Sequence, residues 1–369
     1  MKIAILGTRG IPANYGGFET FTENLSIQLV KRGHEVSVYG RSGYIKTDEK
    51  YFKGVRLRLF PTIIHKYLDT PFNTMLTTTH ALFQSYDVLL YCNTANAIYT
   101  VLPRVFGKKV ALNVDGLEWK RAKWGSFGKS VYKISEFLAT LLPDGVVTDA
   151  QEVQRYYQKK FGKSSTWIPY GAPEARTESA DILNQFGLKK QQYILYVSRL
   201  EPENNAHAVI RAFEKVRTNK KLVIVGDSPF SVDYVRRLKQ TKDPRIIFTG
   251  YVFGQGYGEF QSHAYCYIQA TEAGGTQPAL VDAMGFGNCI LANDVPQHRE
   301  VLGEAGIYFS VHDIKDMIMK LQHLADHPAE VKLYIDKALK RVREKYSWDK
   351  VTSDYEQLFR NMLRKKNDD

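Results

Sequence analysis

Two runs of alternating strand and helix patterns, separated by a linker, constrain this chain more than any other feature. In the first run an amphipathic helix is expected where Phe18, Phe21, Leu25 and Leu29 recur at spacings of three and four residues. Apolar strand candidates occupy Lys2–Leu6, Glu35–Tyr39, Val55–Phe60, Asp87–Cys92, Lys109–Val114 and Gly145–Asp149 in the first run and Tyr193–Ser198, Leu222–Gly226, Arg245–Thr249, Tyr265–Gln269 and Cys289–Asn293 in the second. Strands that alternate with helices predict an α/β fold with parallel sheets covered on both faces.

The linker between the two runs, IPYGAPEARTESAD at residues 168–181, is rich in Pro, Gly, Ala and polar residues and has no periodicity. We therefore place a boundary near Gly171 and expect two Rossmann-like domains, at residues 1–170 and 171–345. Residues 346–369 are expected to form a docked helix with a frayed tail. The apolar stripe of this helix consists of Trp348, Val351, Tyr355, Leu358, Phe359 and Met362. Ligands of open parallel sheets bind beyond the carboxyl ends of the strands, so the loops after strands matter most.

Composition excludes several classes of protein. No apolar run reaches the roughly 18 residues of a membrane span. The three cysteines, Cys92, Cys266 and Cys289, lie in apolar segments without metal-ligand spacing, so we expect buried thiols in a reducing, cytoplasmic location. Lys and Arg number 51 against 39 Asp and Glu, a net charge of +12. Such a basic chain can bind nucleic acid, an anionic membrane surface or a phosphorylated substrate, and charge alone does not choose among them.

The loop GTRGIPANYGGFET at residues 7–20 follows the first strand. It lacks the dinucleotide fingerprint G-x-G-x-x-G, and Arg41, not an acid, ends the second strand. It offers the backbone N–H groups of Gly16 and Gly17 at a helix N-terminus, where the helix dipole attracts anions and hydroxyl groups. Glu19 could accept hydrogen bonds from a sugar, and Arg9 could contact a phosphate. The alternative is a tight turn in which Glu19 only complements the helix dipole.

The loop NVDGLEWKRAKWG at residues 113–125 follows another strand and places Asp115 and Glu118 beside Trp119. Carboxylates next to an aromatic face suit a polyol, although an ordinary polar loop is the alternative. The candidate acceptor-binding residues are Arg9, Gly16, Gly17, Glu19, Asp115, Glu118 and Trp119. Residues 119–133 and 153–163 interleave Lys and Arg with aromatic residues. These basic-aromatic stretches could contact an anionic membrane leaflet, bind nucleic acid, or form a solvated basic face.

In the second half the segments YVSRLEPENNAHAVIRAF, VIVGDSP, TGYV, EAGGTQPALVDAMGFGNCILAND and AGIYF follow in order. Together they resemble the C-terminal domain of glycosyltransferase family 4, retaining GT-B enzymes that use nucleotide-sugar donors. The loop GTRGIPANYGGFET resembles a narrower bacterial subgroup, the rhamnosyltransferase-like proteins of polysaccharide synthesis. The resemblance covers nearly the whole chain. It implies two Rossmann-like domains in tandem that face each other across a cleft, with the C-terminal helix crossing back to the first domain.

The chemistry of these segments agrees with a donor site. Arg199 ends the first strand of the second domain and could hold a diphosphate through charge-assisted hydrogen bonds, each worth about 1.5–3 kcal/mol. Gly274, Gly275 and Thr276 precede a helix that begins near Gln277. Their N–H groups are expected to face the diphosphate or the transferred sugar, where leaving-group charge develops.

Asp282, about one turn into that helix, could accept both ribose hydroxyls. The resemblance assigns the segment that lines the base to Gly250, Tyr251 and Val252. The family usually shows two glutamates eight positions apart. Here Gly274 and Asp282 occupy those positions, and Glu272 stands two residues before the first.

Two further positions depart from the family pattern. Where many members have a lysine shortly after the arginine, this chain has Asn204 and Asn205, and Asp115 stands where many have a histidine. No D-x-D follows a strand, so we expect the arginine and helix N-termini to neutralise the diphosphate without a metal. His263 and His298 are expected near the cleft, and His298 follows a loop that is expected to face the donor side.

The leading hypothesis is a retaining, metal-independent hexosyltransferase that transfers L-rhamnose from dTDP-β-L-rhamnose to a glycan acceptor. Its candidate catalytic residues are Asp115, Arg199 and Glu272. The resemblance implies that the acceptor attacks the face from which the diphosphate leaves, so positioning and leaving-group stabilisation provide the catalysis. A lipid-linked acceptor would explain the basic-aromatic stretches as a peripheral contact with the inner face of the cell membrane. A UDP- or GDP-hexose donor is the first alternative, and an inactive GT-B protein that binds nucleic acid or an anionic membrane is the second. Under the leading hypothesis we expect no cofactor and no nucleic-acid partner.

Overall fold

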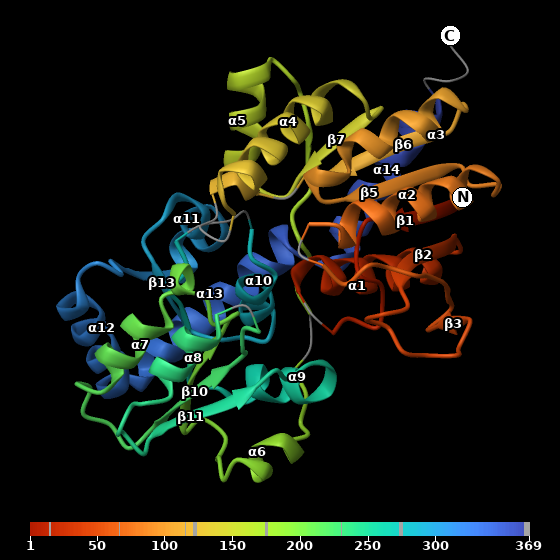
Figure 1. The fold of residues 1–369 in the computed structure, drawn as a ribbon. Coiled ribbons are helices and arrows are strands. Elements are labelled where there is room, and N and C mark those ends of the chain that lie inside the picture. The colour runs from red at the N-terminus through yellow and green to blue at the C-terminus, as the bar shows by residue number, and fades with distance from the viewer. Residues whose placement is uncertain are drawn as a thin grey trace. The chain divides into compact units, whose positions relative to one another are not determined.

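The computed structural model describes residues 1–14, 16–65, 67–114, 116–120, 124–173, 176–229, 231–272 and 276–364. The chain divides into two units (Figure 1). The first comprises Met1–Gly171, Gly274–Thr276 and Trp348–Asp369, and the second comprises Ala172–Ala273 and Gln277–Ser347. The polypeptide therefore leaves the first unit after residue 171, contributes the short segment 274–276 to it, and returns to it at residue 348.

The first unit contains an eight-stranded sheet in the order β3-β4-β2-β1-β5-β6-β7-β8. Its pairs are parallel except for the antiparallel pair β3–β4. The strands are β1 (Lys2–Leu6), β2 (Glu35–Arg41), β3 (Tyr51–Phe52), β4 (Val55–Phe60), β5 (Val88–Cys92), β6 (Lys109–Asn113), β7 (Gly145–Thr148) and β8 (Thr166–Trp167). The strands predicted for this half are present, and the two-residue strands β3 and β8 add to them. Strand order reverses at β1, because β2 and β5 lie on its two sides.

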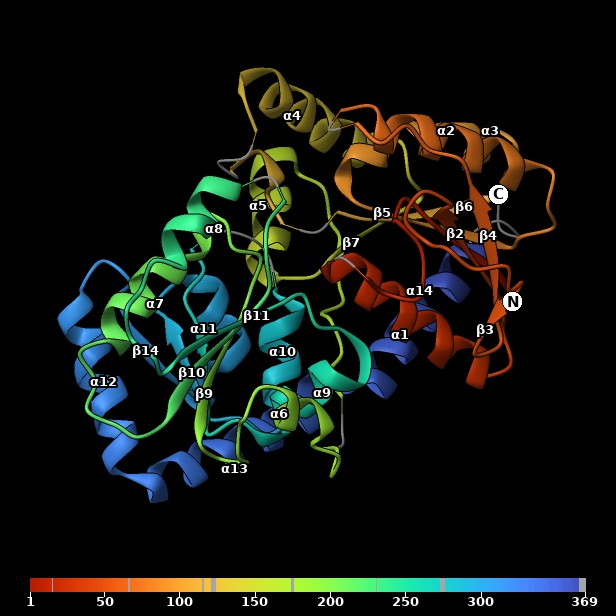
Figure 2. The same ribbon diagram turned by 60° about the horizontal axis from the view of Figure 1, so that its bottom comes forward.

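Helices cover both faces of this sheet (Figure 2). They are α1 (Gly17–Lys31), α2 (Asp69–Leu82), α3 (Val101–Val105), α4 (Ser126–Leu141), α5 (Gln151–Phe161) and α14 (Trp348–Arg364), with short 3-10 helices η1 (Thr94–Thr100) and η2 (Glu118–Lys120). Figures 1 and 2 show α1 and α14 on one face and α2 and α3 on the other. The predicted stripe of α1 is buried at Phe21, Leu25 and Leu29, which pack into a core shared with α14.

Helix α14 completes the core of the first unit. Its predicted apolar stripe is buried except for Leu358, which is half-buried, and Tyr355 and Phe359 are fully inaccessible to solvent. The ring of Tyr355 lies 5.6 Å from that of Phe21 on α1, and Asn113 of β6 donates a hydrogen bond of 2.9 Å to the Tyr355 hydroxyl. Residues from the C-terminal segment thus supply part of the interior around β1 and β6.

The second unit contains a six-stranded, all-parallel sheet in the order β11-β10-β9-β12-β13-β14. The strands are β9 (Tyr193–Val197), β10 (Lys221–Val225), β11 (Ile246–Gly250), β12 (Cys266–Gln269), β13 (Ile290–Asn293) and β14 (Gly306–Phe309). The five strands predicted for this half are present, and β14 extends the sheet by one. Strand order reverses at β9, which lies between β10 and β12.

Two apolar cores sandwich this second sheet, one on each face. The helices are α6 (Asp181–Gln185), α7 (Ala206–Phe213), α8 (Val232–Leu238), α9 (Gly254–His263), α10 (Pro278–Gly285), α11 (Pro296–Leu302), α12 (Ile314–Asp326) and α13 (Pro328–Lys345), with 3-10 helices η3 (Pro202–Asn204) and η4 (Gly303–Ala305). Helices α7, α8 and α12 pack on one face, and α6, α9, α10 and α11 on the other, while α13 contributes side chains to both cores. Among the described residues of the chain, no helix combines the length and apolarity needed to cross a bilayer.

Candidate functional site

The segments after β9 and β12 lie at the point where the strand order of the second sheet reverses. In open parallel sheets, ligands bind beyond the carboxyl ends of the strands at such a point. Arg199 follows β9, and residues 271–277 follow β12. The topology therefore brings these two predicted donor-binding segments to one edge of one sheet.

Arg199 has a well-fixed backbone and a loosely held side chain. Its carbonyl oxygen accepts a hydrogen bond of 2.7 Å from the Asn204 side-chain amide, which is buried. Its guanidinium lies 3.9 Å from a carboxylate oxygen of Glu201 and keeps a quarter of its side-chain area exposed. The asparagine that replaces the family's lysine therefore fixes the loop and adds no charge, while the arginine remains accessible to an anion.

Asn205 connects the loop after β9 to the loop after β12. It adopts a left-handed conformation with φ of +61° just before α7. Its side-chain amide donates to the carbonyl of Ala270 and to a carboxylate oxygen of Glu272, both at 3.0 Å. The other carboxylate oxygen of Glu272 lies 2.8 Å from Nε2 of His312, which follows β14. The predicted catalytic Glu272 is thus held from two sides by residues that the sequence analysis did not select.

Close backbone contact brings the ends of β9, β10 and β11 together. Gly226, which follows β10, has φ of +133° and donates a hydrogen bond of 2.8 Å to the carbonyl of Gly250. A Cβ at Gly226 would lie 1.9 Å from the carbonyl oxygen of Ser198, so only glycine fits there. This contact sets the position of Gly250, the first residue of the segment expected to line the base.

Two aromatic rings follow Gly250. Tyr251 and Phe253 stack with ring centroids 5.8 Å apart and an interplanar angle of 16°, and each is 40% exposed. Val252 between them is half-buried. An exposed, stacked aromatic pair presents a flat apolar face at the carboxyl end of β11, where a nucleobase could pack.

Asp282 of α10 is buried and belongs to a hydrogen-bonded chain. Its carboxylate accepts a bond of 3.1 Å from the Tyr257 hydroxyl, which accepts one of 3.0 Å from the Gln261 amide. Burial raises the pKa of Asp282 to about 7, against the smaller lowering effect of the Tyr257 hydrogen bond. The carboxyl group predicted to hold the ribose therefore changes charge near neutral pH.

A buried polar network holds both ends of the segment 271–277. The Gln269 amide donates to the Thr271 hydroxyl at 2.7 Å and contacts the side chain of Gln277. The Thr271 hydroxyl lies 3.2 Å from Nε2 of His298, whose Nδ1 lies 2.8 Å from the carbonyl of Asn293. Burial lowers the pKa of His298 to about 4, so its imidazole is neutral. His298 therefore supports the loop through hydrogen bonds.

The remaining predictions for the second half have mixed outcomes. Gly274 and Gly275 lie outside the described residues. Thr276 groups with the first unit, is buried, and donates a bond of 2.8 Å to the carbonyl of Asp149. The expectation for His263 was wrong, because α9 ends there just before β12 begins, at the amino end of the sheet. Its Nε2 lies 2.8 Å from the carbonyl of Ser179.

In the first unit, the loop after β1 lies where strand order reverses. Gly16 is the N-cap of α1, and Gly17 is its first residue. The buried side chain of Glu19 accepts a bond of 3.0 Å from the backbone N–H of Arg9. One carboxylate oxygen of Glu19 thus closes the loop onto the helix, which is a structural role that the helix-dipole interpretation did not include.

A buried ion pair beside this loop escaped the sequence analysis. Arg41, at the end of β2, lies 2.6 Å from a carboxylate oxygen of Asp69, the first residue of α2. The same oxygen accepts a bond of 3.0 Å from the Tyr44 hydroxyl. The guanidinium of Arg9 lies 4.2 Å from the centre of the Tyr44 ring. The Arg41–Asp69 pair therefore fixes the aromatic ring against which Arg9 packs.

The two basic-aromatic stretches meet around Trp119. Its ring lies 5.1 Å from the ammonium group of Lys133 in the first stretch and 5.9 Å from that of Lys160 in the second. The neighbouring Glu118 is buried and accepts a bond of 3.1 Å from the Trp124 indole. Asp115 lies outside the described residues. Glu118 and Trp119 thus have partners from within the unit.

Two family models match this chain, one in each unit. Residues 191–327 match the family model "Glycosyl transferases group 1", and residues 88–173 match "Domain of unknown function (DUF1972)". The O-antigen chain mannosyltransferase B of Escherichia coli is 21% identical over 205 residues, which cover 54% of this chain and 52% of that protein. The chain thus spans about half the length of this curated relative.

Solved structures match the whole chain in fold. Sucrose-phosphate synthase (tll1590) from Thermosynechococcus elongatus gives a TM-score of 0.81 at 16% identity, covering 98% of this chain and 99% of that one. Alr3699/HepE of Anabaena, solved in complex with UDP and glucose, gives 0.79 at 16% identity, covering 98% and 100%. The expected GT-B fold with two Rossmann-like units is confirmed.

Proposed function

We propose that this chain is a glycosyltransferase that uses a nucleotide-sugar donor in the synthesis of cell-surface polysaccharide. The observation that carries the proposal is the link made by Asn205 between the loop of Arg199 and the carboxylate of Glu272. A cation suited to a diphosphate and a carboxylate suited to sugar hydroxyls then lie at one topological switch point. The glycosyl transferases group 1 match and the similarity to an O-antigen mannosyltransferase support it.

In the donor site, Arg199 holds the diphosphate and neutralises the charge that develops as the leaving group departs. Asp282 accepts the ribose hydroxyls, and the base packs beside Gly250–Val252. The N–H groups of Gly274, Gly275 and Thr276 complete the diphosphate site, and Gln277 anchors their segment through Gln269. Glu272 orients a hydroxyl of the transferred sugar.

The acceptor site belongs to the first unit. Gly16, Gly17 and Arg9 bind an anionic or hydroxyl-rich part of the acceptor, with Glu19, Glu118 and Trp119 in the surrounding loops. Asp115 orients the attacking hydroxyl. We propose a retaining reaction in which that hydroxyl attacks the face from which the diphosphate departs. No enzyme nucleophile is then required, and positioning supplies most of the catalysis.

For the donor we propose dTDP-β-L-rhamnose, because glycine at position 274 suits a sugar that lacks a hydroxyl at that point. A UDP- or GDP-hexose is the alternative, favoured by the complex of Alr3699/HepE with UDP and glucose. Thermal unfolding with dTDP, UDP, GDP and ADP separates the two. A ligand at 100 times its Kd adds about 2.7 kcal/mol to stability. A response to dTDP alone supports the rhamnosyl donor, and a response to UDP or GDP replaces it.

Two variants test the assignment of the units. Arg199→Ala should abolish the response to the nucleotide while the ligand-free chain unfolds as before. Asp115→Asn should reduce sugar transfer strongly and leave nucleotide binding unchanged. Sugar transfer at the normal rate by Arg199→Ala would show that the donor site lies elsewhere. Equal losses of nucleotide binding and sugar transfer in Asp115→Asn would show that Asp115 does not act on the acceptor. A response to a short oligonucleotide with none to any nucleoside diphosphate would support the inactive binding protein.

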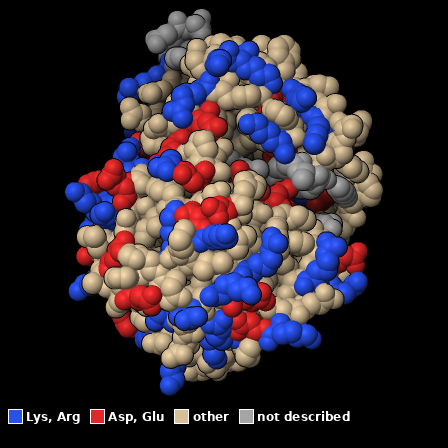
Figure 3. Space-filling model, turned by 90° about the vertical axis from the view of Figure 1, so that its left-hand side faces the viewer, with Lys and Arg blue, Asp and Glu red and all other residues tan. Residues whose placement is uncertain are grey.

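We further propose that the acceptor is lipid-linked and that the chain meets an anionic membrane through α3 and α4. One face of α4 exposes five apolar side chains at helical spacing: Phe127 (73%), Val131 (40%), Ile134 (60%), Phe137 (52%) and Leu141 (53%). Exposed Val105 (76%) and Phe106 (66%) at the end of α3 extend this apolar surface. Lys and Arg side chains gather at the top of the view in Figure 3, where Figure 1 places α4 and α5. An apolar face flanked by basic residues is typical of helices that lie in the headgroup region of an anionic membrane.

Vesicle co-sedimentation tests this surface. The chain should bind vesicles that contain phosphatidylglycerol and not vesicles of phosphatidylcholine alone. Ile134→Glu should reduce binding at least tenfold. Leu333→Glu on α13, where the leucine is 52% exposed, is the matched control and should bind like the unaltered chain. Equal binding by both variants would exclude α4 as the contact.

A further inference from the structure

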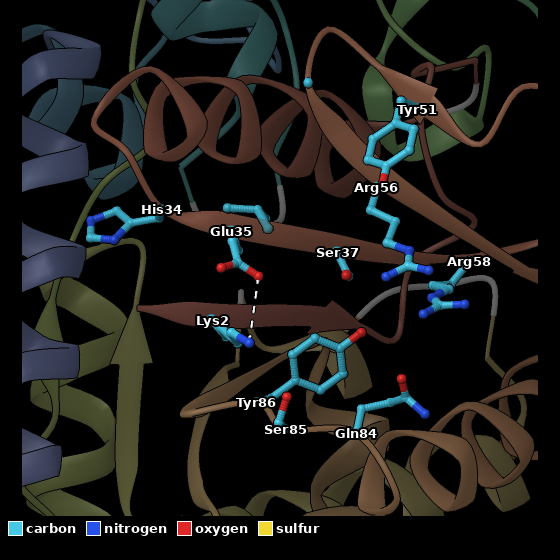
Figure 4. Close-up of a pocket in the computed structure, with 12 residues that line it drawn as sticks. Lys2, His34, Glu35, Ser37, Tyr51, Arg56, Arg58, Gln84, Ser85 and Tyr86 are labelled. Atoms are coloured by element: carbon cyan, nitrogen blue, oxygen red, sulfur yellow. Dashed lines mark ion pairs between the residues drawn. The ribbon is translucent and has the colours of Figure 1, made fainter.

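A pocket of about 270 Å³ opens on the first unit, at the end of the sheet opposite the acceptor loops (Figure 4). Lys2 and Glu35, the first residues of β1 and β2, line it, so it lies at the amino ends of these strands. The loops proposed to bind the acceptor follow the carboxyl ends of β1 and β6. The pocket is therefore separate from them.

Strand register explains the hollow. Arg56 of β4 pairs with Ser37 of β2, which pairs in turn with Ala4 of β1. Cross-strand partners lie on the same face of a sheet. The large side chain of Arg56 is therefore followed, on the next two strands, by the small side chains of Ser37 and Ala4, which leave space above the sheet. Helix α2 ends at Leu82, and the segment Gln84–Tyr86 forms the far wall of the space that remains.

The pocket contains more positive than negative charge. Arg56 and Arg58 are two residues apart on β4 and therefore extend from the same face, as Figure 4 shows. Within the described part of the chain, neither guanidinium has an ion-pair or hydrogen-bond partner, and Nε of Arg58 is buried without one. The carboxylate of Glu35 lies 3.8 Å from the ammonium group of Lys2, so these two exposed charges offset each other.

Neutral hydrogen-bond donors complete the lining. The Tyr86 hydroxyl accepts a bond of 3.3 Å from Tyr39, so its own hydrogen is directed elsewhere. The hydroxyl of Ser37 and the amide of Gln84 also border the space. The pKa of nearby His80 is lowered by burial and, to a smaller extent, by the positive charges of Arg58 and Arg56. Its neutral ring adds no further cation.

We propose that this pocket binds the phosphate group of a small phosphorylated molecule, with Arg56 and Arg58 as its principal ligands. Two guanidinium groups on one face match the oxygens of a phosphate, which accepts several charge-assisted hydrogen bonds. The surrounding groups of Ser37, Gln84 and Tyr86 donate to the remaining oxygens. The volume lies just below the usual range of drug-sized sites, so the ligand is no larger than a sugar phosphate. This site is additional to the donor and acceptor sites and does not depend on them.

Equilibrium dialysis with radiolabelled inorganic phosphate, at constant ionic strength, tests the proposal on the full chain. The double variant Arg56→Gln/Arg58→Gln should weaken phosphate binding at least tenfold. Ser37→Val keeps every charge but fills the hollow with a residue that strands accommodate, and it should weaken binding as strongly. Arg343→Gln removes an exposed arginine on α13 and should bind phosphate like the unaltered chain.

Arg199→Gln separates this site from the donor site. It should lose nucleotide binding and keep the phosphate that depends on Arg56 and Arg58. Unchanged phosphate binding in both the double variant and Ser37→Val would overturn the proposal. Loss of all phosphate binding in Arg199→Gln would overturn it as well, since the phosphate would then occupy only the donor site. Thermal unfolding confirms that each variant is folded before binding is compared.

Discussion

Replacing Asp282 by asparagine should stabilise the second unit at alkaline pH and leave it no more stable in acid. The carboxyl group is buried on α10 and accepts a hydrogen bond from Tyr257. Burial raises its pKa from the ordinary value of 3.8 to about 7, because a charge in this position loses its hydration. Asparagine has the same shape and keeps an oxygen toward Tyr257, but it never ionises.

The sign follows from proton binding. Between pH 4 and 7 the native state holds a proton on Asp282 that the unfolded state has released, so the stability of the unaltered chain falls as pH rises through this window. A shift of about three units at 1.36 kcal/mol each gives roughly 4 kcal/mol at most. The new amide N–H₂ would cost about 1–3 kcal/mol if it lacks an acceptor. Asp282→Asn should therefore gain about 1–3 kcal/mol at pH 8 and lose a similar amount near pH 4.

Urea unfolding at pH 4.5, 6 and 8 measures the difference. Circular dichroism follows both units, whereas tryptophan fluorescence reports on the first unit alone, because all four tryptophans belong to it. Asp233→Asn is the control for the loss of a surface carboxylate, since the Asp233 side chain is 81% exposed. A difference between Asp282→Asn and the unaltered chain that is the same at all three pH values would refute the reasoning. Nucleotide affinity should fall in the variant even where its stability rises.

Three further predictions concern packing and loop geometry. Phe359→Ala should cost about 3–5 kcal/mol, because the ring is completely buried, and tryptophan fluorescence in urea would record the loss; a change below about 1 kcal/mol would mean that α14 contributes little to the core. Gly226→Ala should destabilise the second unit by about 1–3 kcal/mol or more, since its Cβ would overlap the Ser198 carbonyl, and an unchanged circular dichroism transition would contradict this. Asn205→Gly keeps the left-handed backbone but removes the bonds to Glu272 and to the buried carbonyl of Ala270, so we expect about tenfold slower sugar transfer and a loss of about 1–3 kcal/mol in stability. Transfer at the normal rate would show that Glu272 does not need this support.

Local patterns in the sequence were sufficient for the fold, whereas the donor segments were assigned through the resemblance to glycosyltransferase family 4. The order of strands and helices could be read from apolar runs and helical spacing, and the position of Arg199 follows from the end of its strand. The burial of α14 also follows from its apolar stripe. These features depend on neighbours in sequence, which a single chain displays directly.

The supports of the site depend on residues far apart in sequence and were missed for that reason. The sequence analysis noted Asn205 only because it stands where many family members have a lysine, although its side-chain amide donates a hydrogen bond to Glu272. His312 follows β14, a strand that the analysis did not identify, and it contacts the same carboxylate. His263 was misplaced because the direction of α9 relative to the sheet was not considered. One signal in the sequence could have indicated the role of Asn205. An asparagine stands just before a helix where a cation was expected, and asparagine side chains often form hydrogen bonds with nearby groups at such positions.

The return of the chain to the first unit at Trp348 has a consequence for biosynthesis. During translation the N-terminal sheet emerges first, yet the aromatic side chains of α14 that close its core emerge after the entire second unit. The second unit can therefore finish folding on the ribosome, while the first waits with part of its apolar interior uncovered. Chaperone binding to nascent chains should accordingly persist until residues 348–364 have been released, and a chain terminated at residue 347 should aggregate through its N-terminal half.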